Sequence, residues 1–212
     1  MMRWVILGNG PLADYTFARQ MMRIDDFVLC CDGGIRHAHA MQIMPDLVLG
    51  DLDSADPTIV AHYREANVPF EVFPAEKDFT DMELAIQHAA DNRADEILIL
   101  AGIGGRLDHT LANMHILLYA LDLGISAVLA DEKNTVHAMH DTITIAATAG
   151  TIVSLIPADG TVHGVTTTGL YYPLSNETLY AGKSRGVSNV MTGECATITA
   201  TAGRLFVIQS AE

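Results

Sequence analysis

Cysteine is scarce in this chain of 212 residues, and long apolar runs are absent. The three cysteines, Cys30, Cys31 and Cys195, are too few and too unevenly spaced for a disulfide framework or a zinc site. No apolar run approaches the roughly 18–20 residues that span a membrane, and Met1-Met2-Arg3-Trp4 does not begin a signal peptide. We therefore expect a reduced, cytoplasmic protein with no membrane partner.

Basic residues are also few. The chain has 12 lysines and arginines against 26 acids, which gives a net charge of −14. This deficit argues against nucleic acid as a partner, because phosphate backbones bind to basic surfaces. An acidic protein suits cationic ligands, or anionic ligands that arrive with a divalent metal, although solubility is the simpler explanation of the charge. Hydrophobic residues make up 50% of the chain and charged residues 18%, which excludes a disordered chain.

The composition changes near residue 134. Residues 1–133 hold 21 acids, 9 bases and 4 threonines, whereas residues 134–212 hold 5 acids, 3 bases and 14 threonines. Because threonine and low charge favour strands, the change predicts a domain boundary between Lys133 and Asp141. We expect an α/β domain over residues 1–135 and a small β domain over residues 140–212.

The first segment alternates short apolar runs with helix-like stretches. The runs are Trp4–Leu7, Phe27–Cys31, Leu47–Leu49, Phe70–Phe73, Ile97–Ala101 and Ala127–Ala130. The stretches between them are Pro11–Met22, Ile35–Met41, Pro57–Ala66, Thr80–Asp91 and Leu107–Leu121. This alternation predicts βαβ units and a parallel sheet covered on both faces.

The second segment contains short runs of alternating pattern, separated by glycines. The runs are Thr142–Ala146, Thr151–Ile156, Thr161–Thr168, Glu194–Ala200 and Arg204–Gln209. They predict strands of a small sandwich or jelly-roll.

Glycine or acidic residues follow five of the apolar runs in the first segment, and these positions meet at one edge of a parallel sheet. Asp51 and Asp53 point the same way in an extended segment, so a Mg²⁺ ion would relieve their repulsion; a solvated turn with a helix cap is an equal alternative. Asp78 and Asp81 begin a helix and are either caps or further metal ligands.

Other residues at the same edge suit phosphate. Lys77 stands beside these acids, and Thr80 opens a capping box. Arg106 follows a glycine loop, where a planar guanidinium suits a phosphate clamp and an ion pair with Asp108 is the simpler alternative.

The stretch Gly8-Asn9-Gly10-Pro11-Leu12-Ala13 matches G-x-G-x-x-G/A, and Asp32 follows the second apolar run. Together they weakly suggest a dinucleotide site, but Pro11 removes an amide that would face phosphate. The chain has no G-x-x-x-x-G-K-[ST] loop and no G-x-S-x-G elbow, which excludes a Walker-type NTPase and the hydrolases that carry that elbow.

Several stretches together resemble the thiamine pyrophosphokinase family. In the first segment they are Asp32-Gly33-Gly34, Gly50-Asp51-Leu52-Asp53-Ser54, Lys77-Asp78-Phe79-Thr80-Asp81-Met82-Glu83 and Gly104-Gly105-Arg106-Leu107-Asp108-His109. In the second they are Ser154-Leu155-Ile156-Pro157, Gly169-Leu170-Tyr171-Tyr172-Pro173-Leu174 and Ser184-Arg185-Gly186-Val187-Ser188-Asn189. The resemblance covers nearly the whole chain, and the GDLDS and KDxTD stretches are specific in combination.

The resemblance implies an α/β nucleotide-binding domain followed by a β domain, in a homodimer whose thiamine pocket lies between subunits. It also implies transfer of a pyrophosphoryl group from ATP to the hydroxyl group of thiamine, with Mg²⁺ and release of AMP. The implied catalytic residues are Asp51, Asp53, Asp78, Asp81, Arg106 and Asp108, with Asp51, Asp53 and Asp81 as metal ligands. The implied ATP-binding residues are Asn9, Gly10, Asp32, Gly33, Gly34, Lys77, Thr80, Gly105 and Arg106. The implied thiamine-binding residues are Asp108, Ser188 and Asn189.

Two other functions remain open at the level of sequence. One is a nicotinamide-dependent oxidoreductase that uses the glycine stretch at residues 8–13. The other is a nucleotide or metal sensor without turnover, in which the same acids bind but do not react.

Overall fold

The computed structural model describes residues 2–74, 76 and 78–211. The chain forms two compact units, Met1–Glu132 and Lys133–Glu212, and the break falls beside the expected boundary. None of the helices in the described residues combines the length and the apolar character that a membrane span requires.

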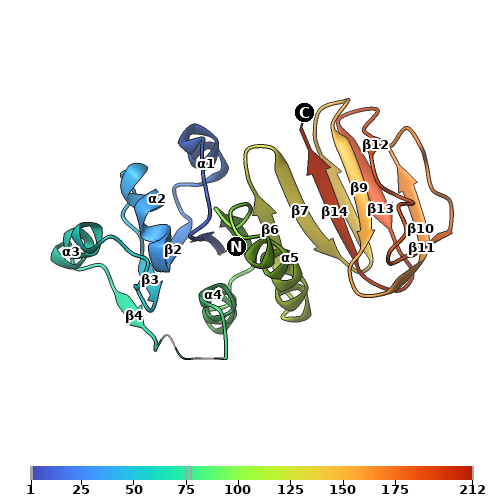
Figure 1. The fold of residues 1–212 in the computed structure, drawn as a ribbon. Coiled ribbons are helices and arrows are strands. Elements are labelled where there is room, and N and C mark those ends of the chain that lie inside the picture. Colours follow the sequence, from blue (N-terminus) through green and yellow to red (C-terminus); the bar gives the residue numbers. More distant parts are fainter. Residues whose placement is uncertain (1, 75, 77, 212) are drawn as a thin grey trace. The chain divides into compact units, whose positions relative to one another are not determined.

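The first unit alternates strands and helices (Figure 1). Its strands are β1 (Arg3–Leu7), β2 (Phe27–Cys31), β3 (Leu47–Gly50), β4 (Phe70–Val72), β5 (Glu96–Leu100) and β6 (Ser126–Ala130). Its helices are α1 (Tyr15–Met21), the 3-10 helix η1 (Asp32–Gly34), α2 (Ile35–Ala40), α3 (Pro57–Glu65), α4 (Asp81–Asp91) and α5 (Leu107–Asp122). The strands lie in the order β6, β5, β1, β2, β3, β4, and each neighbouring pair is parallel. Their carboxyl ends therefore share one edge.

Helices cover both faces of this sheet, which explains why its central strands are buried almost throughout. On one face, Val5 and Leu7 of β1 join Ala18 of α1, Ile35 of α2 and Tyr63 of α3 in one apolar cluster. On the other face, α4 packs against β2 and β3, and α5 packs against β6 and α4 (Figure 1). The expected α/β class is confirmed.

Helix starts in the first unit are set by side-chain caps. Asp56 accepts a hydrogen bond from the Thr58 amide ahead of α3, and Thr80 accepts one from the Glu83 amide ahead of α4. The caps place the starts of both helices within a residue of the expected positions.

The first helix begins later than expected. The sequence predicts a helix from Pro11, whereas α1 begins at Tyr15 with Asp14 as its N-cap. The Glu132 carboxylate accepts hydrogen bonds from the amides of Ala13 and Asp14, both at 2.7 Å, and holds the preceding residues outside the helix. The start of α1 thus combines a local cap, Asp14, with a distant acceptor, Glu132.

The second unit consists of strands alone: β7 (Asn134–Met139), β8 (Thr142–Ala146), β9 (Ile152–Pro157), β10 (Thr161–Thr168), β11 (Glu177–Tyr180), β12 (Asn189–Val190), β13 (Cys195–Thr199) and β14 (Leu205–Ser210). Antiparallel neighbours run β12, β9, β14, β7 in one sheet and β11, β10, β13, β8 in the other. Val153 and Val207 of the first sheet share an apolar core with Val162 and Ile198 of the second. The unit is thus a sandwich.

The sequence analysis missed three of these strands. β11 buries only Leu179 fully and β12 is two residues long, so neither has a clear alternating pattern. β7 lies within the stretch expected to contain the domain boundary.

Candidate functional site

A cavity of about 590 Å³ opens in the first unit at the carboxyl ends of β1, β2, β3 and β5. The starts of α4 and α5 close its other sides. Its lining residues are Gly8, Asn9, Gly10, Pro11, Cys31, Asp32, Asp51, Asp53, Ser54, Phe79, Thr80, Asp81, Met82, Ala101, Gly102, Gly104, Gly105, Arg106, His109, Ala112 and Asn113. This is the sheet edge at which the sequence placed the candidate ligand-binding residues.

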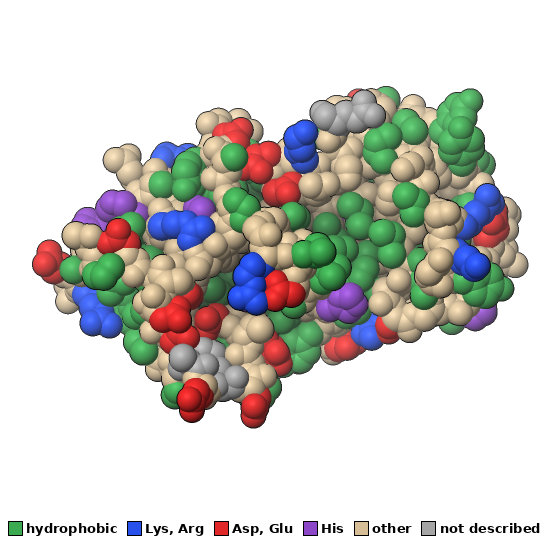
Figure 2. All heavy atoms as spheres, in the orientation of Figure 1, with side chains coloured by type: hydrophobic (Ala, Val, Ile, Leu, Met, Phe, Trp, Pro, Cys, Tyr) green, Lys and Arg blue, Asp and Glu red, His purple; other side chains and the backbone are tan. Residues whose placement is uncertain are grey.

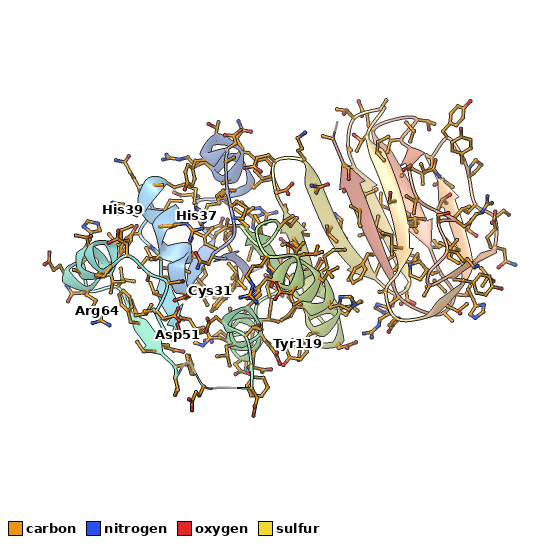
Figure 3. All side chains as sticks on the ribbon, in the orientation of Figure 1. Cys31, His37, His39, Asp51, Arg64 and Tyr119 are labelled. Carbon is orange, nitrogen blue, oxygen red and sulfur yellow. The ribbon has the colours of Figure 1, made fainter. Side chains whose placement is uncertain are left out.

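Three carboxylates form a tight group in this cavity. Oxygen atoms of Asp32, Asp51 and Asp53 lie within 4.8 Å of one another. Asp51 and the end of β2 at Cys31 are labelled in Figure 3. In Figure 2, acidic side chains gather on the displayed face of the first unit. We refer to Asp32, Asp51 and Asp53 as the acidic trio.

The electrostatics of the acidic trio suit a bound cation. Repulsion from Asp51 raises the pKa of Asp53, with smaller contributions from desolvation and from Asp32. Oδ1 of Asp32 is buried and has no hydrogen-bond partner among the residues that the structure describes. An oriented carboxylate oxygen beside two other carboxylates is the kind of donor set that Mg²⁺ takes from proteins.

Asp81 and Asp78 occupy different positions around this group. Asp81 lines the cavity at the start of α4 and contributes to the raised pKa of Asp53, but it is not one of the three most closely grouped acids. Asp78 is exposed and is not among the lining residues. Thr80 lines the cavity and caps α4. Lys77 lies outside the described residues.

The backbone bends sharply where strands reach the cavity. Asp32 after β2, Leu52 after β3 and Ala101 after β5 have φ values of 49°, 64° and 55°. Left-handed backbone costs about 1–2 kcal/mol in a residue that has a Cβ atom. Such residues tend to gather at ligand-binding sites, where surrounding contacts hold them in place.

The loop of Gly8, Asn9 and Gly10 does not act as a dinucleotide fingerprint. The amides of Gly8 and Gly10 donate to the carbonyls of Leu100 and Ala101, at 2.9 and 2.7 Å, and are not free to bind phosphate. The segment also does not open a helix, because α1 begins only at Tyr15. The glycines are needed for close approach, since a Cβ on Gly10 would lie 2.4 Å from the Ala101 oxygen.

Gly33 and Gly34 differ from their expected role as ATP-binding residues. Both are buried in η1 and neither lines the cavity. A Cβ on Gly33 would lie 2.5 Å from the Asn9 side chain, and one on Gly34 would lie 2.2 Å from the Leu7 oxygen. Their function in this structure is to let η1 pack beneath the end of β1.

Arg106 lines the cavity after Gly105, as expected, and pairs with Asp108. Two nitrogens of its guanidinium contact the Asp108 carboxylate, at 3.2 and 2.5 Å, and both side chains are exposed. The hydrogen bond from Arg106 lowers the pKa of Asp108 to about 2. Asp108 itself does not line the cavity. The structure therefore contains the simpler alternative for Arg106, which is an ion pair with Asp108.

In the second unit, Ser188 and Asn189 differ in their surroundings. Asn189 is buried, and its amide accepts from the Tyr172 nitrogen at 2.9 Å and donates to the Tyr172 oxygen at 2.7 Å. It also borders a small cavity of about 210 Å³ with Arg185 and Val187. Ser188 is exposed, has a φ of 58° and does not line that cavity.

Comparison with known proteins assigns both units. A family model described as "Thiamin pyrophosphokinase, catalytic domain" matches residues 18–129. A second, described as "Thiamin pyrophosphokinase, vitamin B1 binding domain", matches residues 140–205. The chain belongs to the thiamine pyrophosphokinase family. The expected resemblance is thus confirmed.

Individual members of the thiamine pyrophosphokinase family support this assignment. Thiamine pyrophosphokinase from Bacillus subtilis is 30% identical over 172 residues, which cover 80% of each chain. A solved structure of that enzyme superposes with a TM-score of 0.90 at 25% identity and covers 99% of both chains. The enzyme from Geobacillus thermodenitrificans superposes with a TM-score of 0.86 at 30% identity, over 100% of this chain and 98% of the other.

Membership in the thiamine pyrophosphokinase family decides between the functions that the sequence left open. The family consists of ATP-dependent diphosphotransferases, so the expectation of an enzyme is confirmed. Neither the oxidoreductase nor the sensor is supported, and the amides of Gly8 and Gly10 argue separately against a dinucleotide.

Asp32, which we expect at the nucleotide, lies in the acidic trio. Other cavity residues were not singled out from the sequence. His109 and Asn113 of α5 were given no role, yet both line the cavity, and the Asn113 amide donates to the Gly102 oxygen at 2.8 Å. Their spacing of four residues on one helix face was the available signal. Phe79 also lines the cavity, and nothing in its sequence context marked it beyond the family stretch.

Proposed function

We propose that this chain transfers the pyrophosphoryl group of ATP to the hydroxyl group of thiamine, giving thiamine diphosphate and AMP, and that the 590 Å³ cavity is where this happens. The observation that carries the proposal is the acidic trio within a glycine-lined cavity, in the unit that matches the catalytic domain of the family. A nucleoside triphosphate with a divalent ion suits this cavity, because the volume is that of a small-molecule site and the negative acidic trio suits the positive ion.

The acidic trio is the proposed Mg²⁺ site, with Asp81 as a further ligand and Asp78 nearby. The fit rests on the close grouping of the carboxylates, the raised pKa of Asp53 and the unpartnered Asp32 oxygen. Bound there, Mg²⁺ supplies charge neutralisation for the phosphate oxygens.

The protein's own residues position and polarise the reactants. Arg106 lies at the cavity mouth as the proposed clamp for phosphate oxygens, and Thr80 and Gly105 line the same wall. The thiamine hydroxyl oxygen forms a bond to the β-phosphorus, and the bond from that phosphorus to the bridging oxygen of AMP breaks. A carboxylate of the cavity accepts the hydroxyl proton.

The second unit is the proposed contributor to thiamine binding. The match to the vitamin B1 binding domain supports this, as does the cavity beside Asn189. Ser188 and Asp108 are the other proposed thiamine residues. We further propose a cytoplasmic homodimer with the thiamine pocket shared between subunits, as the family resemblance implies.

Product analysis tests the function. The protein is incubated with ATP, Mg²⁺ and thiamine, and the mixture is separated by chromatography. Equal amounts of AMP and thiamine diphosphate are expected, and neither forms when thiamine or Mg²⁺ is left out. Formation of ADP with thiamine monophosphate, or of no thiamine product at all, would overturn the proposal.

A further inference from the structure

Two neighbouring side chains of α2 hold the Gly8–Gly10 loop by its carbonyl groups. Nη2 of Arg36 donates to the oxygens of Asn9 and Gly10, both at 2.8 Å, and Nη1 donates to the Gly33 oxygen at 3.2 Å. Nε2 of His37 lies 2.9 Å from the same Gly10 oxygen. Neither side chain lines the cavity. These contacts therefore fix the loop from the side that faces away from the cavity.

His37 is built into this arrangement in one protonation state. Its side chain, labelled in Figure 3, is buried on α2 at 2% exposure. Because the Gly10 oxygen can only accept, Nε2 carries the proton, and Nδ1 accepts from the Tyr15 hydroxyl at 2.9 Å. Burial lowers the pKa of His37, which keeps the ring neutral.

On the other side, the same loop reaches the acidic trio. Nδ2 of Asn9 donates to the Ser54 hydroxyl at 2.6 Å, and that hydroxyl donates to Oδ2 of Asp32. The remaining oxygen of Asp32, Oδ1, is the buried atom without a hydrogen-bond partner in the described residues. The hydrogen-bonded chain Asn9–Ser54–Asp32 thus fixes which Asp32 oxygen is left for a cation.

We propose that Arg36 and His37 are positioning residues, which act through the Gly8–Gly10 loop and the Asn9–Ser54–Asp32 chain to orient a carboxylate of the metal site. In this arrangement Asn9 orients Ser54. The metal part of this inference rests on the proposed function. A side chain that holds a metal-ligating residue without touching the metal typically contributes 10- to 100-fold to metal affinity or activity, and Ser54 is that side chain for Asp32.

Direct metal binding tests the inference without relying on turnover. Mn²⁺ is titrated into the nucleotide-free protein, and free Mn²⁺ is followed by electron paramagnetic resonance. Ser54→Ala and Arg36→Ala are each expected to weaken Mn²⁺ binding about tenfold, since Ser54 is the link that contacts Asp32 and Arg36 holds the loop that carries Asn9. The matched controls are Ser126→Ala and Arg64→Ala, two exposed side chains of the same unit away from the cavity, the second labelled in Figure 3.

A double variant of Arg36 and Ser54 distinguishes a positioning role from a general loss of structure. If Arg36 acts through Ser54, the double variant binds Mn²⁺ little more weakly than either single variant, because the second change removes a contact that is already lost. In activity assays, the KM for Mg-ATP should rise more than kcat falls. Arg36→Lys, which keeps a donor but loses the fork, should regain part of the Mn²⁺ affinity.

Three results would overturn the inference. The first is that Ser54→Ala and Arg36→Ala bind Mn²⁺ as tightly as the controls, and the second is that their losses of affinity multiply in the double variant. The third is that Mn²⁺ binding weakens only in variants whose melting temperature has also fallen sharply. Ser54→Ala and Arg36→Lys supply the test if Arg36→Ala fails to fold. A wild-type protein that binds Mn²⁺ but forms no thiamine diphosphate would contradict the proposed function and leave the positioning result standing.

Discussion

Single residues of the cavity were predictable in type but not in grouping. Asp51 and Asp53 are one residue apart, and their spacing alone predicts a shared direction. Asp32 joins them because β2 and β3 are neighbours in the sheet and because its backbone turns at a φ of 49°. Neither feature is visible in the sequence around Asp32. Spacing in the sequence thus identifies residues that lie together after one strand. Residues that come together from different strands can be identified only when the order of the strands in the sheet is known.

The first prediction concerns Asp53. Replacing it with asparagine removes a repelled carboxylate from the acidic trio, and Asp51 is the main source of that repulsion. The metal-free Asp53→Asn protein is expected to melt at the same or a higher temperature than wild type. AMP release with excess Mg²⁺ is expected to fall nearly to zero, because a ligand charge is lost. A thermal melt and an AMP assay measure the two effects.

Structural capping by Asp53 would give the opposite pair of results. A variant that is less stable yet fully active would remove Asp53 from the metal site. Asp56→Ala is the control for a lost cap, since Asp56 caps α3 and lies outside the cavity lining. That variant should lose about 0.5–2 kcal/mol of stability and keep its activity.

The second prediction concerns Arg106. Arg106→Lys keeps the positive charge and loses the planar fork that the proposed clamp uses to contact two phosphate oxygens. Activity is expected to fall at least tenfold, with the melting temperature unchanged because the pair with Asp108 is exposed. Steady-state kinetics and a thermal melt provide the measurement. Asp108→Asn is the comparison, because it frees Arg106 from its carboxylate and leaves the guanidinium intact. Normal turnover in Arg106→Lys would mean that Arg106 forms only the ion pair with Asp108 and does not clamp phosphate.

At the scale of elements, the positions of strands followed from apolar runs, while their ends depended on distant contacts. The runs at 27–31 and 142–146 match β2 and β8 in full. At the start of α1, the cap Asp14 is local in sequence, whereas Glu132, which accepts from the amides of Ala13 and Asp14, is not visible in the sequence near Pro11. The short strand β12 is an element because Asn189 pairs with Val153 of β9 and holds Tyr172 with its amide. Such elements follow from tertiary contacts rather than from propensity.

The glycines of η1 give a prediction at this scale. A Cβ on Gly34 would meet the backbone oxygens of Leu7 and Gly8 at 2.2 and 2.8 Å, and backbone cannot move aside cheaply. Gly34→Ala is expected to lower the free energy of unfolding by about 1–3 kcal/mol, the usual cost of overpacking. Urea denaturation followed by circular dichroism measures it. Gly193→Ala, whose Cβ would meet nothing within 4 Å, serves as the control and should leave stability almost unchanged. Equal stability of the two variants would contradict the packing role of Gly34.

At the scale of the whole molecule, composition alone separated an acidic α/β unit from a threonine-rich β unit. Charge and threonine content change where the contacts divide the chain, next to Lys133. The two family models match on either side of this division. The chemistry of the reaction, however, came from the combined family stretches and not from composition, because an acidic surface has many explanations.

Assembly gives the prediction for the whole molecule. The second unit exposes Tyr171, Tyr172, Tyr180 and Val187, a concentration of large apolar side chains that suits a protein partner. Light scattering at micromolar concentration is expected to give twice the 22.8 kDa chain mass, because closed two-fold pairing is the commonest assembly. Specific activity should fall on dilution below the dimer dissociation constant. A monomer that retains full activity would contradict a thiamine pocket shared between subunits.

The proposed reaction is attack on the β-phosphorus of ATP by the hydroxyl group of thiamine, in the cavity that holds the acidic trio. ATP carrying ³²P at the β-position distinguishes this from every single-phosphoryl transfer. With Mg²⁺ and thiamine, we expect the label in thiamine diphosphate, unlabelled AMP, and almost no formation of either product by Asp53→Asn. Label recovered in ADP or in free pyrophosphate, with no labelled thiamine compound, would contradict it.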